Sequence, residues 1–322
     1  MRYVIYGAGG IGGTIGGRLF QSGAEVVLIA RGAHHDAIRD RGLTLRGTTG
    51  TDVLSIPVVD HPSHLAIGAD DVLVLAMKTQ DTGVALDAVV AGAHPDVAVV
   101  CAQNGVENER LALRRFRNVH GMSVALPAAH LEPGIVECYA AGAWGILDVG
   151  RFPQGLDAVD ERVAADLVAA GFAATADATV MGRKYAKLLL MNLANVLEAA
   201  CGMDGVLSPL TGEAQAEARA CFAAAGIEPK VADEAERRKA MRHAPVDGQR
   251  RSGGSTWQSL ARGSGSIEVD HLNGEIVLLG RLHGIPTPVN EGLQRLGWRL
   301  VADHVPPGTL TVAAVEAEVR RR

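Results

Sequence analysis

Two stretches of the chain place polar or flexible residues at spacings that could support chemistry. The first, YGAGGIGG, carries Gly7, Gly9 and Gly12 in the pattern G-x-G-x-x-G at the start of the sequence. The second, GRKYAKLLLMNLANVLEAA, spans residues 182–200 and sets lysines and asparagines among leucines. A glycine loop of this spacing can bind the pyrophosphate of a dinucleotide, and a lysine in a closed site can protonate an oxygen that gains charge. Together they point to hydride addition to a carbonyl group.

The glycine loop stands between an expected strand, Arg2–Tyr6, and an expected helix, Ile11–Ser22. In this context Gly7 permits the tight turn, Gly9 lets the backbone approach the phosphates, and Gly12 allows the helix to pack closely on the strand. The N–H groups at the start of the helix then face the phosphate charge. A ligand-free turn and an S-adenosylmethionine site remain as alternatives. The predicted cofactor-binding residues of the loop are Gly7, Ala8, Gly9, Gly10, Ile11 and Gly12.

Arg31 follows the expected strand EVVLIA, where NAD-binding proteins usually carry an acidic residue. A guanidinium group suits a 2′-phosphate in charge and in geometry. The sequence therefore predicts NADP(H), although Arg31 could also be a solvated cation. His34 and His35 come next and could add to the pocket, but two exposed histidines are the simpler interpretation.

Two further loops follow expected strands, at the carboxyl edge where open parallel sheets bind ligands. Lys78 comes after DVLVLA, and Asn104 comes after VAVVCA. Both are predicted to face the cofactor, and Asn104 also the substrate. The alternatives are a surface lysine and an ordinary Asn-Gly turn.

The run from 182 to 200 has the pattern of one amphipathic helix. At about 100° per residue, Lys184 lies roughly 60° and Asn195 roughly 80° from Lys187, and Asn192 lies at the edge of the same stripe, roughly 140° round. Lys187 and Asn195 would then be about 12 Å apart along the axis, a span suited to a small polar substrate. A solvated face with snorkelling lysines is the alternative, but it explains the asparagines less well.

The C-terminal part offers partners for such a lysine. In SIEVDHLNGEI, Glu268 and Asp270 could supply the carboxylate that keeps the lysine charged. Ser255 and Thr256 supply hydroxyl groups that could bind a carboxylate or a ketone oxygen. They lie in the glycine-rich segment 248–266, which composition alone would describe as a flexible loop.

The elements that must position these residues differ between the two halves of the chain. The first half alternates apolar strands with amphipathic helices, which indicates a parallel sheet covered on both faces. An extra strand pair is expected around residues 43–45 and 53–59, and antiparallel strands from 119 to 149. A helix at 157–170 and a strand at 172–176 follow, and nearly everything beyond is helical. We expect domains at 1–176 and 177–322. The other expected strands are Glu25–Ala30, Asp71–Ala76 and Val97–Ala102, and the other expected helix is Thr82–Ala91.

Composition excludes several classes of protein. The chain has 322 residues, a net charge of −5 and 4% aromatic residues, which argues against binding nucleic acid or an anionic membrane surface. No apolar run approaches the roughly 20 residues of a membrane span. The four cysteines are widely spaced, which predicts free thiols in a reducing cytoplasm and no metal site.

Taken together, these motifs resemble those of the ketopantoate reductase family. The resemblance covers nearly the whole chain through GAGGIG, Arg31, LAMKT, QNGVEN, KYAKLLLMNLAN and STWQSLARGSGSIEVDHLNGEIVLLGRLHGIPTPVN. It implies an α/β N-terminal Rossmann-type dinucleotide-binding domain, an all-α C-terminal domain, a site in the cleft and often a homodimer. The implied reaction is the NADPH-dependent reduction of 2-dehydropantoate to pantoate, a step of pantothenate biosynthesis.

The resemblance also implies roles for individual residues. Lys187 matches the catalytic lysine, and Glu268 matches the acid that contacts the reacting oxygen. Lys78 matches a cofactor-loop lysine. The residues implied to bind substrate are Asn104, Asn192, Asn195, Ser255 and Thr256.

Three positions depart from the family pattern. Met191 stands where an asparagine is frequent, with Asn192 beside it, and Gly253 stands where members carry an asparagine. Asp204-Gly205 replaces an Asn-Gly pair. These departures leave open a reductase of a different small 2-keto acid, ketone or imine. A non-catalytic NADP(H) sensor is an alternative of another class.

Overall fold

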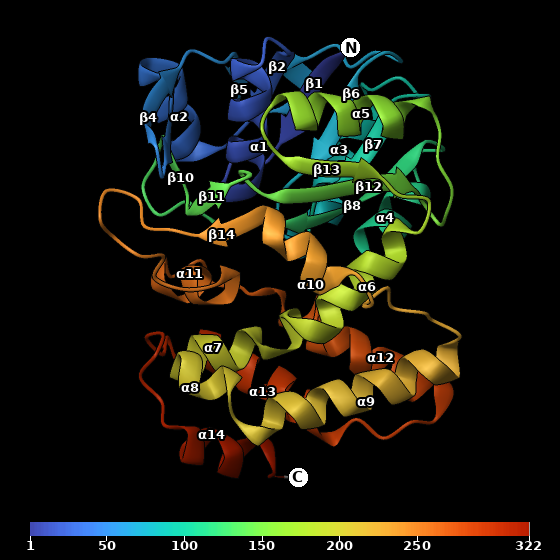
Figure 1. The fold of residues 1–322 in the computed structure, drawn as a ribbon, viewed down its shortest axis with the longest axis vertical. Coiled ribbons are helices and arrows are strands. Elements are labelled where there is room, and N and C mark those ends of the chain that lie inside the picture. Colours follow the sequence, from blue (N-terminus) through green and yellow to red (C-terminus); the bar gives the residue numbers. More distant parts are fainter. Residues whose placement is uncertain (322) are drawn as a thin grey trace. The chain divides into compact units, whose positions relative to one another are not determined.

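The computed structural model describes residues 1–321, whose contacts divide the chain into two compact units. Unit 1 contains Met1–Met181 and Ala232–Arg251; unit 2 contains Gly182–Val231 and the chain from Ser252 onward. Figure 1 shows the strands in unit 1 and the helical character of unit 2. The domain division near residue 176 stays a prediction. The return of Ala232–Arg251 to unit 1 was not expected, because that segment carries no sequence signal that separates it from the helices around it.

Unit 1 is built on an eight-stranded sheet. Its strand order is β13-β12-β8-β7-β6-β1-β2-β5, and neighbouring strands are parallel except for the antiparallel pair of β8 and β12. The expected strands at the N-terminus and in the middle of the sheet are therefore confirmed, with ends that differ by a residue or so. The strands are β1 (Arg2–Tyr6), β2 (Glu25–Ile29), β5 (Val58–Val59), β6 (Val72–Leu75), β7 (Ala98–Cys101), β8 (Val119–Ala125), β12 (Ile146–Arg151) and β13 (Ala173–Ala176).

Helices cover both faces of this sheet, as Figure 1 shows. Alternate strand residues enter two separate cores: Tyr3 and Ile5 pack in the core that contains residues of α1 and α5, whereas Val4 and Tyr6 pack in the core that contains residues of α3 and α4. This alternation follows from the two-residue side-chain period of a strand. The helices of unit 1 are α1 (Gly10–Gln21), α2 (Gly32–Arg41), α3 (Thr82–Val90), α4 (Asn108–Leu113), α5 (Ala158–Ala169) and α10 (Glu234–Arg237).

Two smaller sheets complete unit 1. The expected extra strand pair exists as the antiparallel ladder of β3 and β4, but Val58–Val59 joins the edge of the main sheet instead. The returning segment 232–251 contributes β14, which pairs with β11 and is an exception to the mainly helical C-terminal half that was expected. The strands are β3 (Leu43–Gly47), β4 (Gly50–Leu54), β9 (Ala128–Ala129), β10 (Ile135–Cys138), β11 (Ala140–Gly142) and β14 (Met241–His243).

Unit 2 consists of helices. One of them lies in the glycine-rich segment 248–266, so the description of that segment as a flexible loop is wrong between Ser255 and Ala261. The Trp257 ring packs against Gly253, and the Ser259 hydroxyl donates to the Ser255 carbonyl oxygen at 2.9 Å. The helices are α6 (Val180–Leu190, which begins in unit 1), α7 (Asn195–Cys201), α8 (Met203–Val206), α9 (Pro209–Ala225), α11 (Ser255–Ala261), α12 (Asn273–His283), α13 (Pro288–Ala302) and α14 (Val312–Val319).

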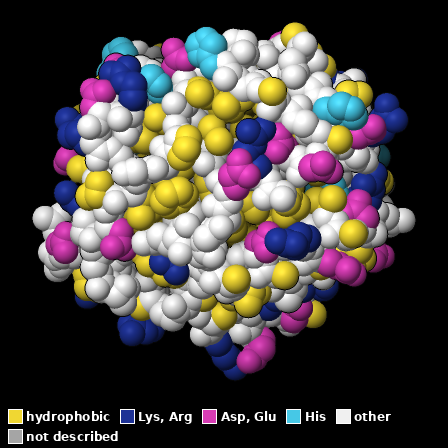
Figure 2. Space-filling view, turned by 90° about the horizontal axis from the view of Figure 1, so that it is seen from above, with side chains coloured by type: hydrophobic (Ala, Val, Ile, Leu, Met, Phe, Trp, Pro, Cys, Tyr) yellow, Lys and Arg dark blue, Asp and Glu magenta, His cyan; other side chains and the backbone are white. Residues whose placement is uncertain are grey.

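The surface carries charges of both signs. Figure 2 shows acidic and basic side chains interspersed on the face in view, with no broad area of one sign. This agrees with the modest net charge of −5. Every helix within residues 1–321 is too short or too polar to cross a bilayer.

Candidate active site

The glycine loop joins β1 to α1, and two of its glycines are required by the fold itself. Gly7 has a φ of +99°, and a β-carbon there would lie 2.7 Å from the Met77 backbone nitrogen. A β-carbon at Gly12 would lie 2.1 Å from the Gly7 carbonyl oxygen. Both positions therefore exclude any side chain, and the loop lies directly against the segment that follows β6.

Gly9 differs, because the protein leaves room beside it. A β-carbon at Gly9 would meet only the Cδ2 atom of His130, at 3.9 Å. Gly9 is also the N-cap of α1, whose first turn has no side-chain cap and no acidic residue. The first N–H groups of a helix need partners, and an anion is a good one. A glycine with open space at an uncapped helix start fits a pyrophosphate.

Arg31 lies at the end of β2 and is the N-cap of α2. Its side chain is exposed and makes no hydrogen bond within residues 1–321. Burial raises the pKa of the neighbouring Tyr6 hydroxyl, and the positive charge of Arg31 opposes that rise. The guanidinium group is thus available to an anionic ligand at the carboxyl edge of the sheet, which fits the 2′-phosphate of NADP.

His34 and His35 are both half-buried, so the interpretation of the pair as exposed histidines is wrong; of the two, His34 contacts the glycine loop. Its Nε2 lies 2.8 Å from the Ala8 carbonyl oxygen. Burial lowers its pKa, and the hydrogen bond to Ala8 opposes that effect. The sequence carries a signal for this position, because His34 stands one helical turn beyond the strand end that carries Arg31.

The loops after β6 and β7, which carry Lys78 and Asn104, are joined by a buried polar network. The Asn108 side-chain amide donates to the Thr79 hydroxyl and to the Asn104 carbonyl oxygen, both at 3.1 Å. The Gln103 amide donates to the Thr82 hydroxyl at 2.7 Å, and that hydroxyl donates to Asn108 at 2.8 Å. The network holds both loops against each other at the carboxyl edge of the sheet. The sequence reasoning missed its four residues, Thr79, Thr82, Gln103 and Asn108, although they lie in or beside the motifs quoted above.

The structure therefore brings three of the predicted groups together within unit 1: the glycine loop, the Lys78 loop and the Asn104 loop. Lys78 and Asn104 are both half-buried. Lys187, Asn192, Asn195, Ser255, Thr256 and Glu268 belong to unit 2.

The lysine-bearing segment of unit 2 is not one helix. α6 ends at Leu190, Met191 has irregular torsion angles, and a 3₁₀ turn at Asn192–Ala194 precedes α7. The predicted continuous helix over 182–200 is therefore wrong, and the roughly 12 Å separation that was calculated from it no longer follows. The helical spacing of Lys184 and Lys187 within α6 still holds. Lys184 is buried and Lys187 is half-buried.

A distant side chain stabilises the break. The Asn273 amide at the start of α12 donates to the Leu193 carbonyl oxygen and to Asn290, both at 3.1 Å. Asn290 is held in turn by the Ala214 carbonyl oxygen and by Glu217. Both asparagines are fully buried. A carbonyl group that leaves the regular helix pattern needs a donor, and Asn273 supplies it.

The segment with Ser255 and Thr256 is anchored to α7. Gly254, the N-cap of α11, donates its N–H to the Glu198 carboxylate at 3.0 Å. Glu198 stands one turn after Asn195, and α7 packs against α11. This arrangement brings Asn195 into the same part of unit 2 as the two hydroxyl residues. Thr256 is buried and Ser255 is half-buried.

The structure separates the two carboxylate candidates. Asp270 is exposed, and it accepts hydrogen bonds from Gln294 at 2.7 Å and from Trp298 at 2.8 Å. Glu268 is buried. Its neighbour Val269 packs against Gly297 of α13, where a β-carbon would lie 2.9 Å from the valine side chain. Glu268 is thus shielded from solvent, whereas Asp270 braces a surface turn, and the catalytic role of Glu268 stays a prediction.

The remaining reactive groups have structural explanations. None of the four cysteines forms a disulfide within residues 1–321, and burial raises the pKa of Cys138 to about 12 and also raises the pKa of Cys201 and Cys221. None of these three is activated as a nucleophile. The cluster of His120, Asp157 and Asp160 has a metal-like spacing. Its carboxylates are engaged in the N-terminal cap of α5, in an ion pair with Arg151 and in a hydrogen bond to His120.

Two surface pockets lie away from these groups. One, of about 350 Å³, is in unit 1 between Arg41 and the turn at Glu132–Gly134. The other, of about 440 Å³, is in unit 2 and is mainly apolar, beside Leu190 and Ile227. Neither pocket is lined by a predicted site residue, so pocket volume does not identify the candidate active site.

Comparisons with known proteins agree with the motifs. The family model described as Ketopantoate reductase PanE/ApbA matches residues 3–154, and the model of its C-terminal part matches residues 179–297. The chain belongs to the ketopantoate reductase family. Its members are oxidoreductases acting on CH–OH groups, and the fold, a Rossmann-like unit with a helical C-terminal part, is that of the family.

Individual relatives match over nearly their whole length. The chain is 31% identical to the 2-dehydropantoate 2-reductase of Archaeoglobus fulgidus over 92% of this chain and 96% of the relative. It is 27% identical to the enzyme of the same name from Pyrococcus horikoshii, over 90% and 94%.

Solved structures give the same result. A PanE/ApbA family ketopantoate reductase from Ralstonia eutropha superposes with a TM-score of 0.79 at 31% identity, covering 94% of this chain and 99% of that chain. A D-mandelate dehydrogenase in complex with NADH and anilino(oxo)acetate shares the fold, with a TM-score of 0.80 at 22% identity over 94% and 99%. The ketopantoate reductase fold thus also occurs in a dehydrogenase of a different 2-hydroxy acid.

Proposed function

We propose that the protein reduces 2-dehydropantoate to pantoate with NADPH, a step of pantothenate biosynthesis. The main support is that the family match spans both halves of the chain while the glycine loop, Arg31, Lys187 and Glu268 are all present. The reaction adds a hydride to the ketone carbon and a proton to the ketone oxygen. The expected product is a 2-hydroxy acid.

The choice of NADPH over NADH rests on Arg31. An exposed guanidinium group without an internal hydrogen bond stands where an acidic residue would select NAD. The glycine loop would hold the pyrophosphate, and Lys78 and Asn104 would contact the rest of the cofactor. When bound, the nicotinamide supplies the hydride.

The protein side chains are proposed to supply a proton to the ketone oxygen and to orient the substrate. Lys187 donates a proton to the ketone oxygen as negative charge develops there, and the buried Glu268 carboxylate keeps the ammonium charged and oriented. Asn104, Asn192, Asn195, Ser255 and Thr256 would bind the substrate and fix its position, which is where proximity lowers the barrier.

The test is an NADPH oxidation assay with 2-dehydropantoate and a panel of other 2-keto acids. Turnover of 2-dehydropantoate with a kcat/KM at least about 10⁴ M⁻¹s⁻¹, well above that of the other acids, supports the proposal. Tight NADPH binding with no turnover of any substrate would contradict it and would favour a non-catalytic NADP(H) sensor.

A second candidate is the reduction of a different small 2-keto acid, and Gly253 favours it. A β-carbon at Gly253 would lie 2.5 Å from the Trp257 ring, so an asparagine cannot occupy this position without moving the ring. Met191 is 40% exposed and replaces another polar group of the family pattern. The absence of a polar side chain at both positions suits a less polar substrate side chain. Preferential turnover of an aryl 2-keto acid would establish this candidate.

We further propose a cytoplasmic homodimer. Three free thiols with raised pKa values suit a reducing compartment. Leu278 and Leu282, one turn apart on α12, are 44% and 68% exposed and could pack against a second copy. Light scattering coupled to gel filtration tests the dimer, and a monomer mass would refute it.

A further inference from the structure

His34 connects the glycine loop to a second segment of unit 1. Its Nε2 lies 2.8 Å from the Ala8 carbonyl oxygen, and its Nδ1 lies 2.9 Å from the Gly134 backbone nitrogen. A carbonyl oxygen accepts and a backbone N–H donates, so the ring proton is on Nε2 and Nδ1 is the acceptor. The two contacts therefore specify one neutral tautomer of His34.

The second segment, which carries His130 and Gly134, contacts the His34 ring closely. Gly134 has a φ of +83°, and a β-carbon there would lie 2.9 Å from Ala37 on α2. The His130 ring packs against the His34 ring, tilted by 45° with centroids 4.0 Å apart, and His130 Nδ1 lies 3.0 Å from the Ile135 carbonyl oxygen. The turn that carries Gly134 and the ring of His130 thus hold His34 from two sides.

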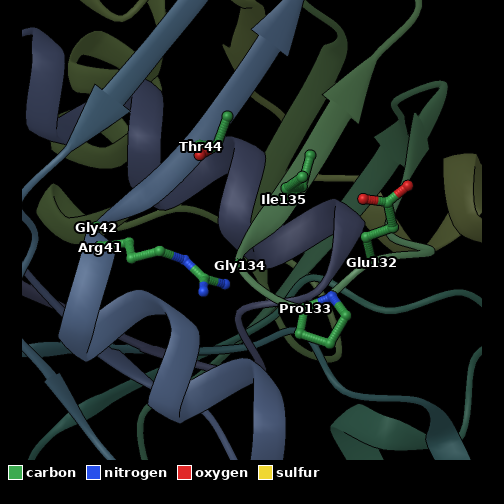
Figure 3. Close-up of a pocket in the computed structure, with 7 residues that line it drawn as sticks. All are labelled: Arg41, Gly42, Thr44, Glu132, Pro133, Gly134 and Ile135. Atoms are coloured by element: carbon green, nitrogen blue, oxygen red, sulfur yellow. The ribbon is translucent and has the colours of Figure 1, made fainter.

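The other side of this turn is open. It borders the pocket of about 350 Å³ that Arg41 and Glu132 also line. Figure 3 shows the Arg41 side chain extending toward the Pro133–Gly134 turn across this space. The turn is restrained by the Thr44 N–H of β3, which donates to the Gly134 carbonyl oxygen at 2.8 Å, and by the contacts with α2, including that of His34.

The bond to Ala8 has a consequence for the next peptide group. In a planar trans peptide the C=O and the following N–H point in opposite directions. A fixed Ala8 carbonyl therefore fixes the direction of the Gly9 N–H, on the side away from His34. Gly9 is the glycine beside which the protein leaves room.

We propose that His34 is a positioning residue for the cofactor: by holding the Ala8 carbonyl group it orients the Gly9 N–H toward the pyrophosphate of the dinucleotide. This inference rests on the proposed function, in which the glycine loop binds NADPH. His34 touches no reacting atom, so its effect falls on cofactor affinity and not on the chemical step.

A set of three variants separates the two hydrogen bonds of His34. His34→Gln places an amide donor near the position of Nε2 and can keep the bond to Ala8. His34→Asn places an amide oxygen near the position of Nδ1 and can keep only the bond from Gly134. His34→Ala keeps neither. His35→Ala, next along the same helix and bonded only to Asp36 by its side chain, is the control.

The readout is the Kd of NADPH by fluorescence titration, with kcat at saturating NADPH. We expect His34→Ala and His34→Asn to raise the Kd about tenfold, His34→Gln to stay within about threefold of wild type, and kcat to change less than about twofold throughout. The comparison of the NADPH Kd between His34→Gln and His34→Asn still tests the inference if His34→Ala folds poorly.

The opposite order, with Asn restoring affinity and Gln failing, would show that His34 merely supports the Gly134 turn and would overturn the inference. Unchanged Kd values in all three variants would overturn it as well. Wild-type titration is done first, because a wild type that does not bind NADPH refutes the proposed function together with the inference. A wild type that binds while the variants bind equally refutes the inference alone.

Discussion

The glycine loop of unit 1 and the lysine-bearing segment of unit 2 both contain irregular backbone next to groups proposed for chemistry. In the loop, the irregularity is fixed in part by residues close in sequence, because Gly12 lies against the Gly7 carbonyl group, and in part by the Met77 backbone that lies against Gly7. In the lysine segment, the break after Leu190 is stabilised by Asn273, eighty residues from Leu193. The first irregularity has a local component that the glycine spacing encodes, whereas the second depends on a hydrogen bond from a distant residue.

This difference predicts how the glycine loop and the lysine-bearing segment respond to substitution. The loop has little freedom, because any side chain at Gly7 or Gly12 collides with backbone. The break in unit 2 depends on hydrogen bonds of ordinary strength. Four substitutions can break or sharpen this comparison.

Gly12→Ala should have the largest effect. Its β-carbon would approach the Gly7 carbonyl oxygen to 2.1 Å and the Ile5 side chain to 2.9 Å, so β1 and α1 must separate. We expect a loss of about 4 kcal/mol or more in the free energy of unfolding, measured by urea denaturation. Gly9→Ala is the matched control: it should fold normally but weaken NADPH binding at least about tenfold. Equal stability losses in the two variants would refute the distinction between these glycines.

Lys187→Ala should lower kcat about 10²-fold or more while leaving the Kd of NADPH nearly unchanged, because it removes the proposed proton donor. Steady-state kinetics with saturating NADPH measures this. The comparison variant is Lys184→Ala, from the same face of α6 but at a buried position. If Lys184→Ala is folded and inactive while Lys187→Ala is active, the wrong lysine has been assigned.

Arg31→Ala should weaken NADPH binding about ten- to a hundredfold and leave NADH binding unchanged, because charged hydrogen bonds contribute about 1.5–3 kcal/mol. Competition between the two cofactors is the measurement. Arg41→Ala, at the other end of α2, serves as the control for a general loss of positive charge. Parallel losses for both cofactors would contradict the selection of a 2′-phosphate.

Asn273→Ala should have the smallest effect of the four. It leaves the Leu193 carbonyl oxygen and Asn290 without a donor, at a cost of about 1–3 kcal/mol. We expect a lower midpoint of thermal unfolding and a higher KM for the keto acid, with the Kd of NADPH unchanged. Gln294→Ala, which removes a surface hydrogen bond in the same unit, should change stability by less than about 0.5 kcal/mol. A wild-type KM in Asn273→Ala would show that the break does not need this bond.

The parallel sheet and the glycine loop could be predicted because their signals are local. Apolar runs of strand length mark β1, β2, β6 and β7, and glycine spacing marks the turn into α1. Residue types indicated both Glu268 and Asp270 as candidates; the family resemblance singled out Glu268, and the two carboxylates then differ in burial. The 248–266 segment was misjudged, because its glycines favour a loop while the helix within it is stabilised by Trp257 and Glu198.

The sequence by itself determined the family, the Rossmann-like half, the dinucleotide loop and the residue types of the candidate site. These depend on backbone torsion, side-chain period and the order of motifs, all of which act over a few neighbouring residues. The tertiary structure alone decided that α6 stops at Leu190, that 232–251 joins unit 1 and that His34 holds Ala8. Each of these depends on hydrogen bonds between residues far apart in the chain, whose partners a local pattern does not specify.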